Sequence, residues 1–465
     1  MPVAMESDTL STGNRQIDMI LRGGFPKNSI NIIMGQPGTG KTIFAEQLVF
    51  FNAAHGDRPI LYLTTLSEPI SKVLTYLQRF SFYDEDKIGS IIHYREVGRN
   101  LIERGIEGFA QTIEEMILEL SPRIIVIDSF RGLKDIANSQ SEYRRMLFDL
   151  AGILSAFDTT VFLVGEYTER DYMESPEFAI ADGIIQFSRK SETNKDERFL
   201  RVLKLRGSSY AEGLHGCSIS NDGLSVYPRL VSPKHIESYS WKKERISCGI
   251  PDMDRLLDGG LWRGASTLVA GPTGSGKTTF SLMFALEAIK CKEKSLYVNF
   301  QENPTQLLRA IDTLGYSQEE LRKGGMEFVY ASPVELQIDS IVVTILRLLE
   351  EQKFSRVVID AVGDLSMAAS DGSRLHDYLY ALSQTLAVQD ISSMLVYETA
   401  SSNIESLSAD GSARYSNMAD NIILLSSGHH PTYERELRCV KARGCNHDLK
   451  AHPFDITQKG IEIRS

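Results

Sequence analysis

The sequence has little cysteine, no long apolar run and no excess of positive charge. Its cysteines are five in number, Cys217, Cys248, Cys291, Cys439 and Cys445, and no two have C-x-x-C spacing. We therefore expect reduced thiols in a cytoplasmic protein, without a disulfide framework or a zinc knuckle. No stretch approaches the roughly 18 consecutive apolar residues of a membrane span, and the N-terminus lacks the apolar core of a signal peptide, so no membrane association is expected.

Charge and composition narrow the classes of function. The chain of 465 residues has 50 Lys and Arg against 61 Asp and Glu, a formal net charge of −11. A strongly basic nucleic-acid-binding surface is not expected, although a local basic groove stays open. Apolar residues at 42% and charged residues at 24% are typical of globular proteins. The length is sufficient for two to four domains of ordinary size.

One domain-sized segment occurs twice. Residues 11–44 and 247–280 align without a gap, with 12 of 34 positions identical and an offset of 236 residues between Lys41 and Lys277. An aspartate after an apolar run and a Lys-x-Arg-Gly element recur near the same offset. So long a period indicates a duplicated domain and not a solenoid. Proline and charged residues near 228–243 are typical of a linker. We predict two domains, residues 1–232 and 233–465.

Strand and helix patterns alternate within each half. In the first half we predict strands at 30–34, 60–64, 124–127 and 160–164, and helices at 41–54, 113–120 and 143–157. The all-apolar strands are typical of a parallel sheet buried on both faces. Residues 183–226 are strand-rich with turn residues and predict antiparallel edge strands. The predicted fold class is therefore α/β, with tandem P-loop domains, each a mostly parallel central sheet flanked by helices.

Two glycine-rich segments, 35–42 and 271–278, fit the pattern G-x-x-x-x-G-K-[ST]. Glycines let backbone N–H groups surround phosphate oxygens at a helix N-terminus, and the lysine reaches the terminal phosphates. A chance glycine turn is the alternative, but an apolar strand precedes both copies and a helix pattern follows them. The residues expected to bind nucleotide are Gly35, Gly38, Thr39, Gly40, Lys41 and Thr42, and Gly271, Thr273, Gly274, Ser275, Gly276, Lys277 and Thr278.

Other polar residues at matching positions are candidates for a metal site and for catalysis. Asp128 and Asp360 end apolar strands, where P-loop enzymes place the carboxylate that supports Mg²⁺ together with the P-loop threonine, here Thr42 or Thr278. A strand-end cap is the alternative. The Lys-x-Arg-Gly cations are either a solvated strand face or groups that reach the nucleotide of a neighbouring subunit. These cations are Lys204, Arg206, Lys441 and Arg443.

With these features the sequence resembles the KaiC family, two-domain RecA-superfamily ATPases of the bacterial circadian clock. The resemblance covers residues 10–463 and rests on the doubled domain, Gly-Gly at 23–24 and 259–260, both P-loops, both Lys-x-Arg-Gly elements and residues 414–425. It implies tandem RecA-like domains that bind ATP and Mg²⁺, and a homohexameric double ring with ATP between protomers. It further implies slow hydrolysis in the first domain and autophosphorylation in the second. It also implies that Glu166 and Glu398 face the γ-phosphate, with an ordinary strand-end residue as the alternative.

The sequence departs from the family at its catalytic glutamates. The KaiC family has a Glu-Glu pair after the second strand of each domain. Here the pairs are Ser67-Glu68 and Gln301-Glu302. A serine cannot accept a proton as a carboxylate does, and a glutamine is a poor base. We expect slow ATP turnover, with Glu68 and Glu302 as the carboxylates that could substitute.

Two further departures concern phosphorylation and regulation. The family's adjacent Ser-Thr acceptors are Ser416 and Asn417 here, which leaves Ser416 as the candidate phosphoacceptor, or else an ordinary turn serine. The family continues past its last strand into a tail that the regulator KaiA engages. This sequence ends at Ser465, so KaiA-type binding is not expected, whereas a KaiB-like partner stays open.

Three functions follow from these features. The favoured one is a nucleotide-gated, hexameric KaiC-like signalling hub that hydrolyses ATP slowly and has serine autokinase activity. A second is a non-catalytic, ATP-dependent assembly switch for a partner such as a sensor kinase. A third is a RecA-like DNA recombinase or helicase, for which Arg131 and Lys134 after Asp128 would face DNA; the net charge counts against it.

Overall fold

The computed structural model of the chain describes residues 8–65, 69–192, 195–233, 243–300, 302–332, 337–368, 372–399, 416–430 and 433–464. The chain divides into two compact units, Met1–Arg229 and Leu230–Ser465. The predicted boundary between residues 232 and 233 lies a few residues from this division. No helix in the described ranges is long and apolar enough to cross a bilayer.

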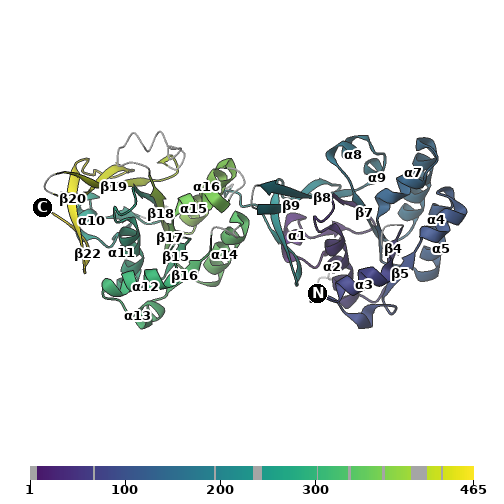
Figure 1. Ribbon diagram of the computed structural model, residues 1–465, viewed down its shortest axis with the longest axis horizontal. Helices are drawn as coiled ribbons and strands as arrows, with labels where there is room; N and C mark the ends of the chain where they lie inside the picture. Colours follow the sequence, from purple (N-terminus) through teal and green to yellow (C-terminus); the bar gives the residue numbers. More distant parts are fainter. Residues whose placement is uncertain are drawn as a thin grey trace, which may run out of the picture. The chain divides into compact units, whose positions relative to one another are not determined.

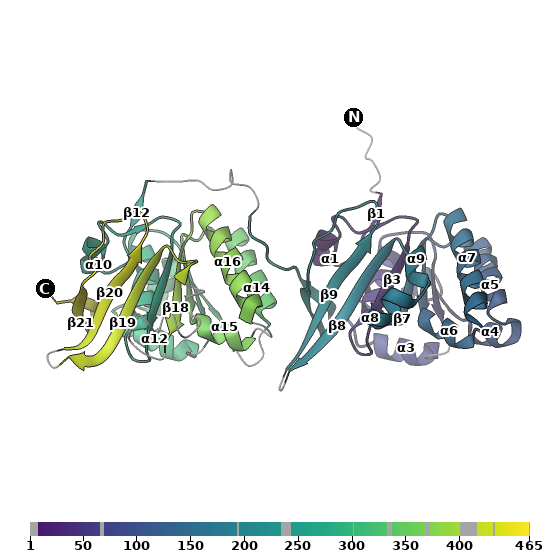
Figure 2. The same cartoon turned by 90° about the horizontal axis from the view of Figure 1, so that it is seen from above.

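The first unit is built on a nine-stranded sheet of order β11-β10-β9-β8-β3-β7-β6-β4-β5. Pairing is parallel from β5 to β8 and antiparallel from β8 to β11, and Figure 2 shows β8 and β9 as long strands at this edge. The strands are β3 (Ile30–Gly35), β4 (Ile60–Thr64), β5 (Ile92–Glu96), β6 (Ile124–Asp128), β7 (Thr160–Glu166), β8 (Gly183–Glu192), β9 (Lys195–Leu205), β10 (His215–Ser220) and β11 (Gly223–Tyr227), beside a small pair, β1 (Thr9–Leu10) and β2 (Phe25–Pro26).

Helices cover both faces of this sheet (Figure 1). Successive side chains of a strand point to opposite faces. Along β6, Ile124 and Val126 therefore pack in the core that contains α2 residues, and Ile125 and Ile127 in the core with α5 and α7 residues. The helices are α1 (Arg15–Ile20), α2 (Lys41–Ala54), α3 (Ile70–Leu77), α4 (Gly98–Arg104), α5 (Glu107–Leu120), α6 (Leu133–Ile136), α7 (Gln140–Ala156), α8 (Glu169–Glu174) and α9 (Glu177–Ile180).

The second unit repeats this sheet with the equivalent order β16-β15-β17-β18-β14-β19-β20-β21-β22. Its strands are β14 (Ser266–Gly271), β15 (Ser295–Asn299), β16 (Met326–Tyr330), β17 (Arg356–Asp360), β18 (Ser392–Glu398), β19 (Asn421–His430), β20 (Tyr433–Ala442), β21 (Ala451–Thr457) and β22 (Gly460–Ile463), beside β12 (Arg245–Ile246) and β13 (Leu261–Trp262). Its helices are α10 (Pro251–Leu256), α11 (Lys277–Lys290), α12 (Pro304–Thr313), α13 (Gln318–Lys323), α14 (Ile338–Glu351), α15 (Val362–Ala368) and α16 (Gly372–Val388).

The predicted fold class is confirmed: each unit has a mostly parallel sheet flanked by helices, with antiparallel strands at one edge. The largest difference among the predicted helices is at the start of α5, which begins at Glu107 and not at residue 113. Helix α7 begins at Gln140 and not at residue 143. Ser139 caps this helix by accepting a hydrogen bond from the backbone N–H of Glu142 at 3.2 Å. The apolar pattern alone could not show the added turn, because its residues are polar.

Candidate functional site: two nucleotide sites at one edge of each sheet

Strand order brings the predicted site residues together at the carboxyl ends of the parallel strands in each sheet. In the first unit β7 lies between β3 and β6, and Gly35 at the end of β3 pairs with Glu166. Asp128, the last residue of β6, pairs with Val164, which lies two residues before Glu166 on β7. The second unit places Gly271 opposite Glu398 in the same way. Because these strands are parallel, their carboxyl ends meet at one edge, where open α/β sheets bind ligands.

The first glycine of each P-loop stands where a side chain would not fit. A Cβ at Gly35 would lie 2.2 Å from the backbone oxygen of Phe187, and one at Gly271 would lie 2.4 Å from that of Leu425. Gly40 precedes α2 with φ of 104°, a left-handed conformation that glycine adopts without steric cost. This backbone leaves the first N–H groups of α2 directed at the site, as anion binding requires.

The P-loop lysines are buried and fold back over their own loops. Lys41 Nζ donates to the backbone oxygen of Gln36 at 2.9 Å, and Lys277 Nζ donates to that of Pro272 at 2.8 Å. Burial lowers the pKa of Lys41, an effect opposed by the negative charges of Glu166 and Asp128. The negative charges of Glu398 and Asp360 oppose the same effect of burial at Lys277, and a bound triphosphate would add negative charge that favours the cationic form of both lysines.

Other polar P-loop groups shape the loop or contact the strand-end glutamate. Thr39 Oγ1 donates to the oxygen of Gln36 at 2.8 Å. In the second unit Thr273 Oγ1 donates to Glu398 Oε1 at 2.6 Å, and Glu398 Oε2 lies 3.8 Å from Lys277 Nζ. Gly38, Gly274, Ser275 and Gly276 complete the two loops, and Gly274 and Gly276 have positive φ angles.

Each strand-end aspartate contacts the P-loop threonine and a buried tyrosine. Asp128 Oδ2 accepts hydrogen bonds from Thr42 Oγ1 at 2.8 Å and from the Tyr62 hydroxyl at 3.1 Å. The Tyr297 hydroxyl donates to Asp360 Oδ2 at 2.7 Å. Burial raises the pKa of Asp360, an effect opposed by hydrogen bonds from Tyr297 and Thr278. The tyrosines were not identified from the sequence.

The donor set fits Mg²⁺ better than a cation held by protein alone. No group of three or more His, Cys, Asp or Glu that could bind a metal occurs within the described ranges. Mg²⁺ characteristically uses one or two carboxylates, several waters and substrate phosphates. One aspartate and one hydroxyl beside a phosphate loop provide those protein ligands.

In the first unit these groups line a cavity of about 480 Å³. Its walls include Lys41, Thr42, Tyr62, Asp128 and Glu166. A cavity of this volume is within the usual range for small-ligand sites. The cations, the carboxylates and the loop amides all belong to the same unit.

The cations of the Lys-x-Arg-Gly elements lie at the opposite end of the parallel strands, where β3 begins. Leu205, the last residue of β9, pairs with Gly183, which lies beside Asn31 near the start of β3. The P-loop follows Gly35, four residues further on, or about 13 Å along the strand. Lys204 and Arg206 thus lie at the end of the sheet away from their own P-loop. Arg206 forms an ion pair with Asp182 at 3.1 Å.

The second unit has the same arrangement and adds Ser416 to it. Lys441 Nζ donates to the backbone oxygens of Ser416 and Ala419 at 3.0 and 2.7 Å, and Arg443 pairs with Asp420 at 3.3 Å. Asp420 in turn accepts from the N–H of Ser266, the first residue of β14. Ser416 therefore belongs to the edge that carries Lys441 and Arg443, away from the P-loop after Gly271.

A second pair of cations on the same strands was missed by sequence reasoning. Arg198 Nε on β9 donates to the oxygen of Gly38 at 3.4 Å, and Arg435 Nε on β20 donates to that of Gly274 at 3.3 Å. Both precede the lysine of Lys-x-Arg-Gly by six residues. This common spacing was the available sign that each arginine contacts the P-loop of its own unit.

The substituted glutamate positions are only partly described. Ser67, Glu68 and Gln301 lie outside the described residues, as do Arg414 and Tyr415. The N–H of Glu302 donates to Asn299 Oδ1 at 3.4 Å. Burial, and then the negative charge of Asp360, raise the pKa of Glu302. Its carboxyl is thus close enough to Asp360 to interact with its charge.

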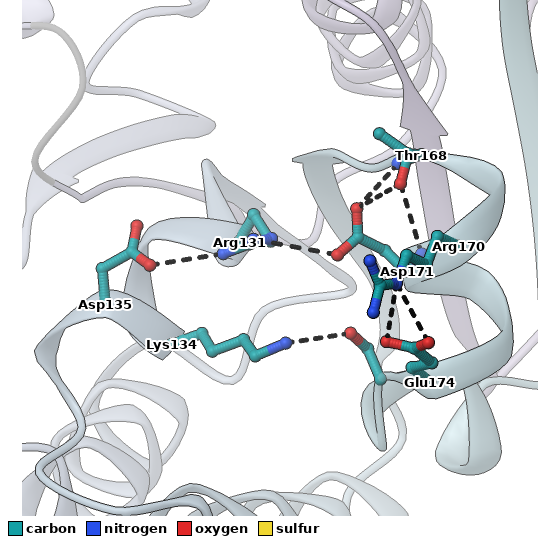
Figure 3. A network of polar contacts seen from close by, with 8 residues as sticks. Arg131, Lys134, Asp135, Thr168, Arg170, Asp171 and Glu174 are labelled. Carbon is teal, nitrogen blue, oxygen red and sulfur yellow. Dashed lines mark hydrogen bonds and ion pairs between the residues drawn. The ribbon is translucent and has the colours of Figure 1, made fainter.

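The two cations proposed for DNA contact have partners within their own unit. Figure 3 shows Arg131 between two acidic residues, Asp135 at 3.4 Å and Asp171 at 3.8 Å. Lys134 Nζ donates to the Ser175 hydroxyl at 3.2 Å. These contacts join the segment after β6 to the segment that contains α8. They give no support to a pore-facing DNA loop.

Comparisons of the sequence with a family model and with known proteins indicate the same family. A family model described as ATPase: KaiC matches residues 10–231 and 246–465. A circadian clock oscillator protein KaiC of Prochlorococcus marinus (strain MIT 9313) is 25% identical over 473 residues, which cover 99% of this chain and 93% of the relative. The KaiC of Synechococcus elongatus is 24% identical, with 96% and 87% covered. The circadian clock protein KaiC3 of a Synechocystis strain is 24% identical, with 98% and 92% covered.

Proposed function

Because the chain belongs to the KaiC family of ATPases, we propose that it binds Mg-ATP in both domains, hydrolyses it slowly, and assembles around it as a homohexameric double ring in the cytoplasm. The observation that carries this proposal is the pair of matching sites, each with a phosphate loop, a buried lysine and a threonine–aspartate contact. Such a ring acts as a nucleotide-gated signalling hub.

The chemistry of the site is phosphoryl transfer to water. Lys41 and Lys277, with the loop amides, neutralise the charge of the phosphates. Thr42 with Asp128, and Thr278 with Asp360, hold Mg²⁺, which supplies further positive charge at the phosphate oxygens. Glu166 and Glu398, the last residues of β7 and β18, face the terminal phosphate.

The positions of the other cations support subunit interfaces as the place of reaction. Lys204 and Arg206 are about 13 Å along the sheet from their own P-loop, too far to contact its phosphates. In a ring, the same edge of one subunit can face the P-loop edge of the next. Arg206 and Arg443 then act on the neighbour's ATP in the manner of arginine fingers.

Slow turnover follows from Ser67 and Gln301, which lack the carboxylate that orients water. Gln301→Glu and Ser67→Glu are each expected to raise ATP hydrolysis about 100-fold, the lower end of what positioned general bases contribute. Phosphate release and native mass spectrometry should be measured together in wild type and both variants. Hexamers with ATP and a low wild-type rate support the proposal; a wild-type rate that neither variant raises contradicts it.

Ser416 is the acceptor that we propose for autophosphorylation. Its backbone is held by Lys441 at the edge opposite its own P-loop, so the donor would be a neighbour's ATP. Incubation with Mg-ATP should yield phosphate on the peptide that contains Ser416. That phosphate should be absent from Ser416→Ala. Peptide mass spectrometry that finds no phosphate, or finds it elsewhere, rejects the assignment.

The assembly switch is the second candidate, and the replaced glutamates favour it. In this case ATP binding assembles the ring and presents a surface to a partner, such as a sensor kinase or a KaiB-like protein, without turnover. ATP-dependent hexamers with undetectable hydrolysis would favour the switch over the enzyme.

A further inference from the structure

A buried carboxyl group, which forms no ion pair among the described residues, lies close enough to the metal-site aspartate of the first domain to interact with its charge. Glu46, the sixth residue of α2, is 0% exposed. Among the described residues, the groups that act on its pKa are Tyr94, Asp128 and Tyr62, and none of them is a lysine or arginine. A lone ionised carboxylate buried in this way is strongly unfavourable. Its presence therefore requires an explanation.

The hydrogen bonds around Glu46 lead to Asp128. The Tyr94 hydroxyl donates to Glu46 Oε2 at 2.7 Å, whereas the buried Oε1 has no hydrogen-bond partner among the described residues. The Tyr62 hydroxyl interacts with the Glu46 carboxyl and donates its proton to Asp128 Oδ2 at 3.1 Å. The rings of Tyr62 and Tyr94 lie 5.1 Å apart, so both hydroxyls are near the same carboxyl.

Counting protons shows how all four groups can be satisfied. A tyrosine hydroxyl has one proton, and an ionised carboxylate can only accept. Since Tyr62 gives its proton to Asp128, an ionised Glu46 leaves Oε1 without a donor. A protonated Glu46 removes this conflict, because it can donate to the Tyr62 oxygen while it accepts from Tyr94. Burial raises the pKa of Glu46 to about 8, in agreement with a protonated group.

The second domain lacks this arrangement. Its sixth residue of α11 is Leu282, also buried, and the residue that matches Tyr94 is Phe328. Tyr297 still donates to Asp360, but its hydroxyl contacts Ser281 Oγ at 2.7 Å. The same fold therefore accommodates an apolar pair at these two positions. The polar pair of the first domain is not needed for packing.

We propose that Glu46 is a positioning residue of the first nucleotide site, where its protonated carboxyl, held by Tyr94, donates to Tyr62 and keeps the Tyr62 hydroxyl on Asp128. This inference rests on the proposed function, in which Asp128 supports Mg²⁺. It makes the first domain's response to Mg²⁺ depend on a residue that the second domain does not have.

The test uses the full chain with Lys277→Ala, so that nucleotide binding reports on the first domain alone. Binding of a fluorescent ATP analogue is measured as a function of free Mg²⁺. Glu46→Leu, which installs the residue of the second domain, is expected to raise the half-saturating Mg²⁺ concentration roughly fivefold, the effect of one hydrogen bond. Glu46→Gln, which can still donate and accept, is expected to stay within about twofold.

Two controls separate positioning from folding. The double variant Glu46→Leu with Tyr94→Phe recreates the apolar pair of the second domain and is expected to unfold at no lower temperature than the parent, while its Mg²⁺ response stays weakened. The same Glu46→Leu change in a Lys41→Ala chain, where only the second site binds, is expected to have no effect on the Mg²⁺ response.

The outcomes distinguish this inference from the proposed function. A Lys277→Ala chain that binds no nucleotide in a Mg²⁺-dependent way contradicts both. Mg²⁺-dependent binding that Glu46→Leu does not shift, or that Glu46→Gln impairs as strongly as Glu46→Leu, overturns the role of Glu46 alone.

Discussion

Lys41→Ala is expected to remove ATP from the first domain and leave the second loaded, and Lys277→Ala to do the reverse. Each lysine is buried in its P-loop and bonds a loop carbonyl that a phosphate oxygen would replace as its partner. Loss of a charge-assisted contact of this kind lowers affinity about 100-fold. The bound nucleotide, measured by native mass spectrometry or by release from denatured protein, should fall from two per chain to one.

Neither variant should unfold the chain, because burial disfavours the charged form of both lysines. Lys290→Ala is the matched control: this lysine ends α11, the helix that Lys277 begins, and pairs with Glu287 at 2.9 Å near the surface. It should leave both sites loaded. Two nucleotides on Lys41→Ala, or loss from both domains in each single variant, would contradict independent P-loop sites.

The two lysine variants also separate the functions that remain open. If assembly is lost in one variant while turnover is lost in the other, the domains have divided the two tasks. If assembly depends on ATP and neither the wild type nor any variant hydrolyses it, the non-catalytic switch is the correct function.

Arg356→Ala is expected to destabilise the second unit by about 3–5 kcal/mol, the usual effect of breaking a buried charged network. The side chain is 1% exposed and donates to the backbone oxygens of Ser247 and Phe284 at 2.6 and 3.2 Å. It also lies 3.5 Å from Glu293 and over the Phe284 ring. Its removal leaves two carbonyls and a carboxylate without this partner.

Arg123→Ala provides the control, because Arg123 directly precedes β6, one residue before the position that matches Arg356, is only half-buried and forms no such network in the described part of the chain. Its expected cost is about 1 kcal/mol or less. Urea unfolding followed by hydrogen exchange would assign each loss to its unit. Equal losses for the two variants would show that the buried network does not contribute the stability assigned to it.

Much of the fold could be predicted because its determinants are local. The apolar runs of β3, β4 and β6 and the spacing of α2 are contained within short segments, and the structure has them at or within a residue of the predicted limits. The P-loops are also local, since loop and helix are consecutive. Ser67 and Gln301, which stand where the family has glutamates, lie outside the described residues. Their roles therefore stay predictions.

The sequence by itself determined that a domain is duplicated and that each copy has a phosphate loop and a strand-end aspartate. The replacement of one glutamate in each catalytic pair is a prediction from the resemblance to the family. Only the tertiary structure decided which distant residues meet these groups. Tyr62, Glu46 and Arg198 have no motif, because their positions depend on strand order and on the contact of α2 with the sheet. Strand direction likewise placed Lys204 and Arg206 away from their own P-loop. Pairing between strands far apart in the chain is a long-range property, and local patterns do not encode it.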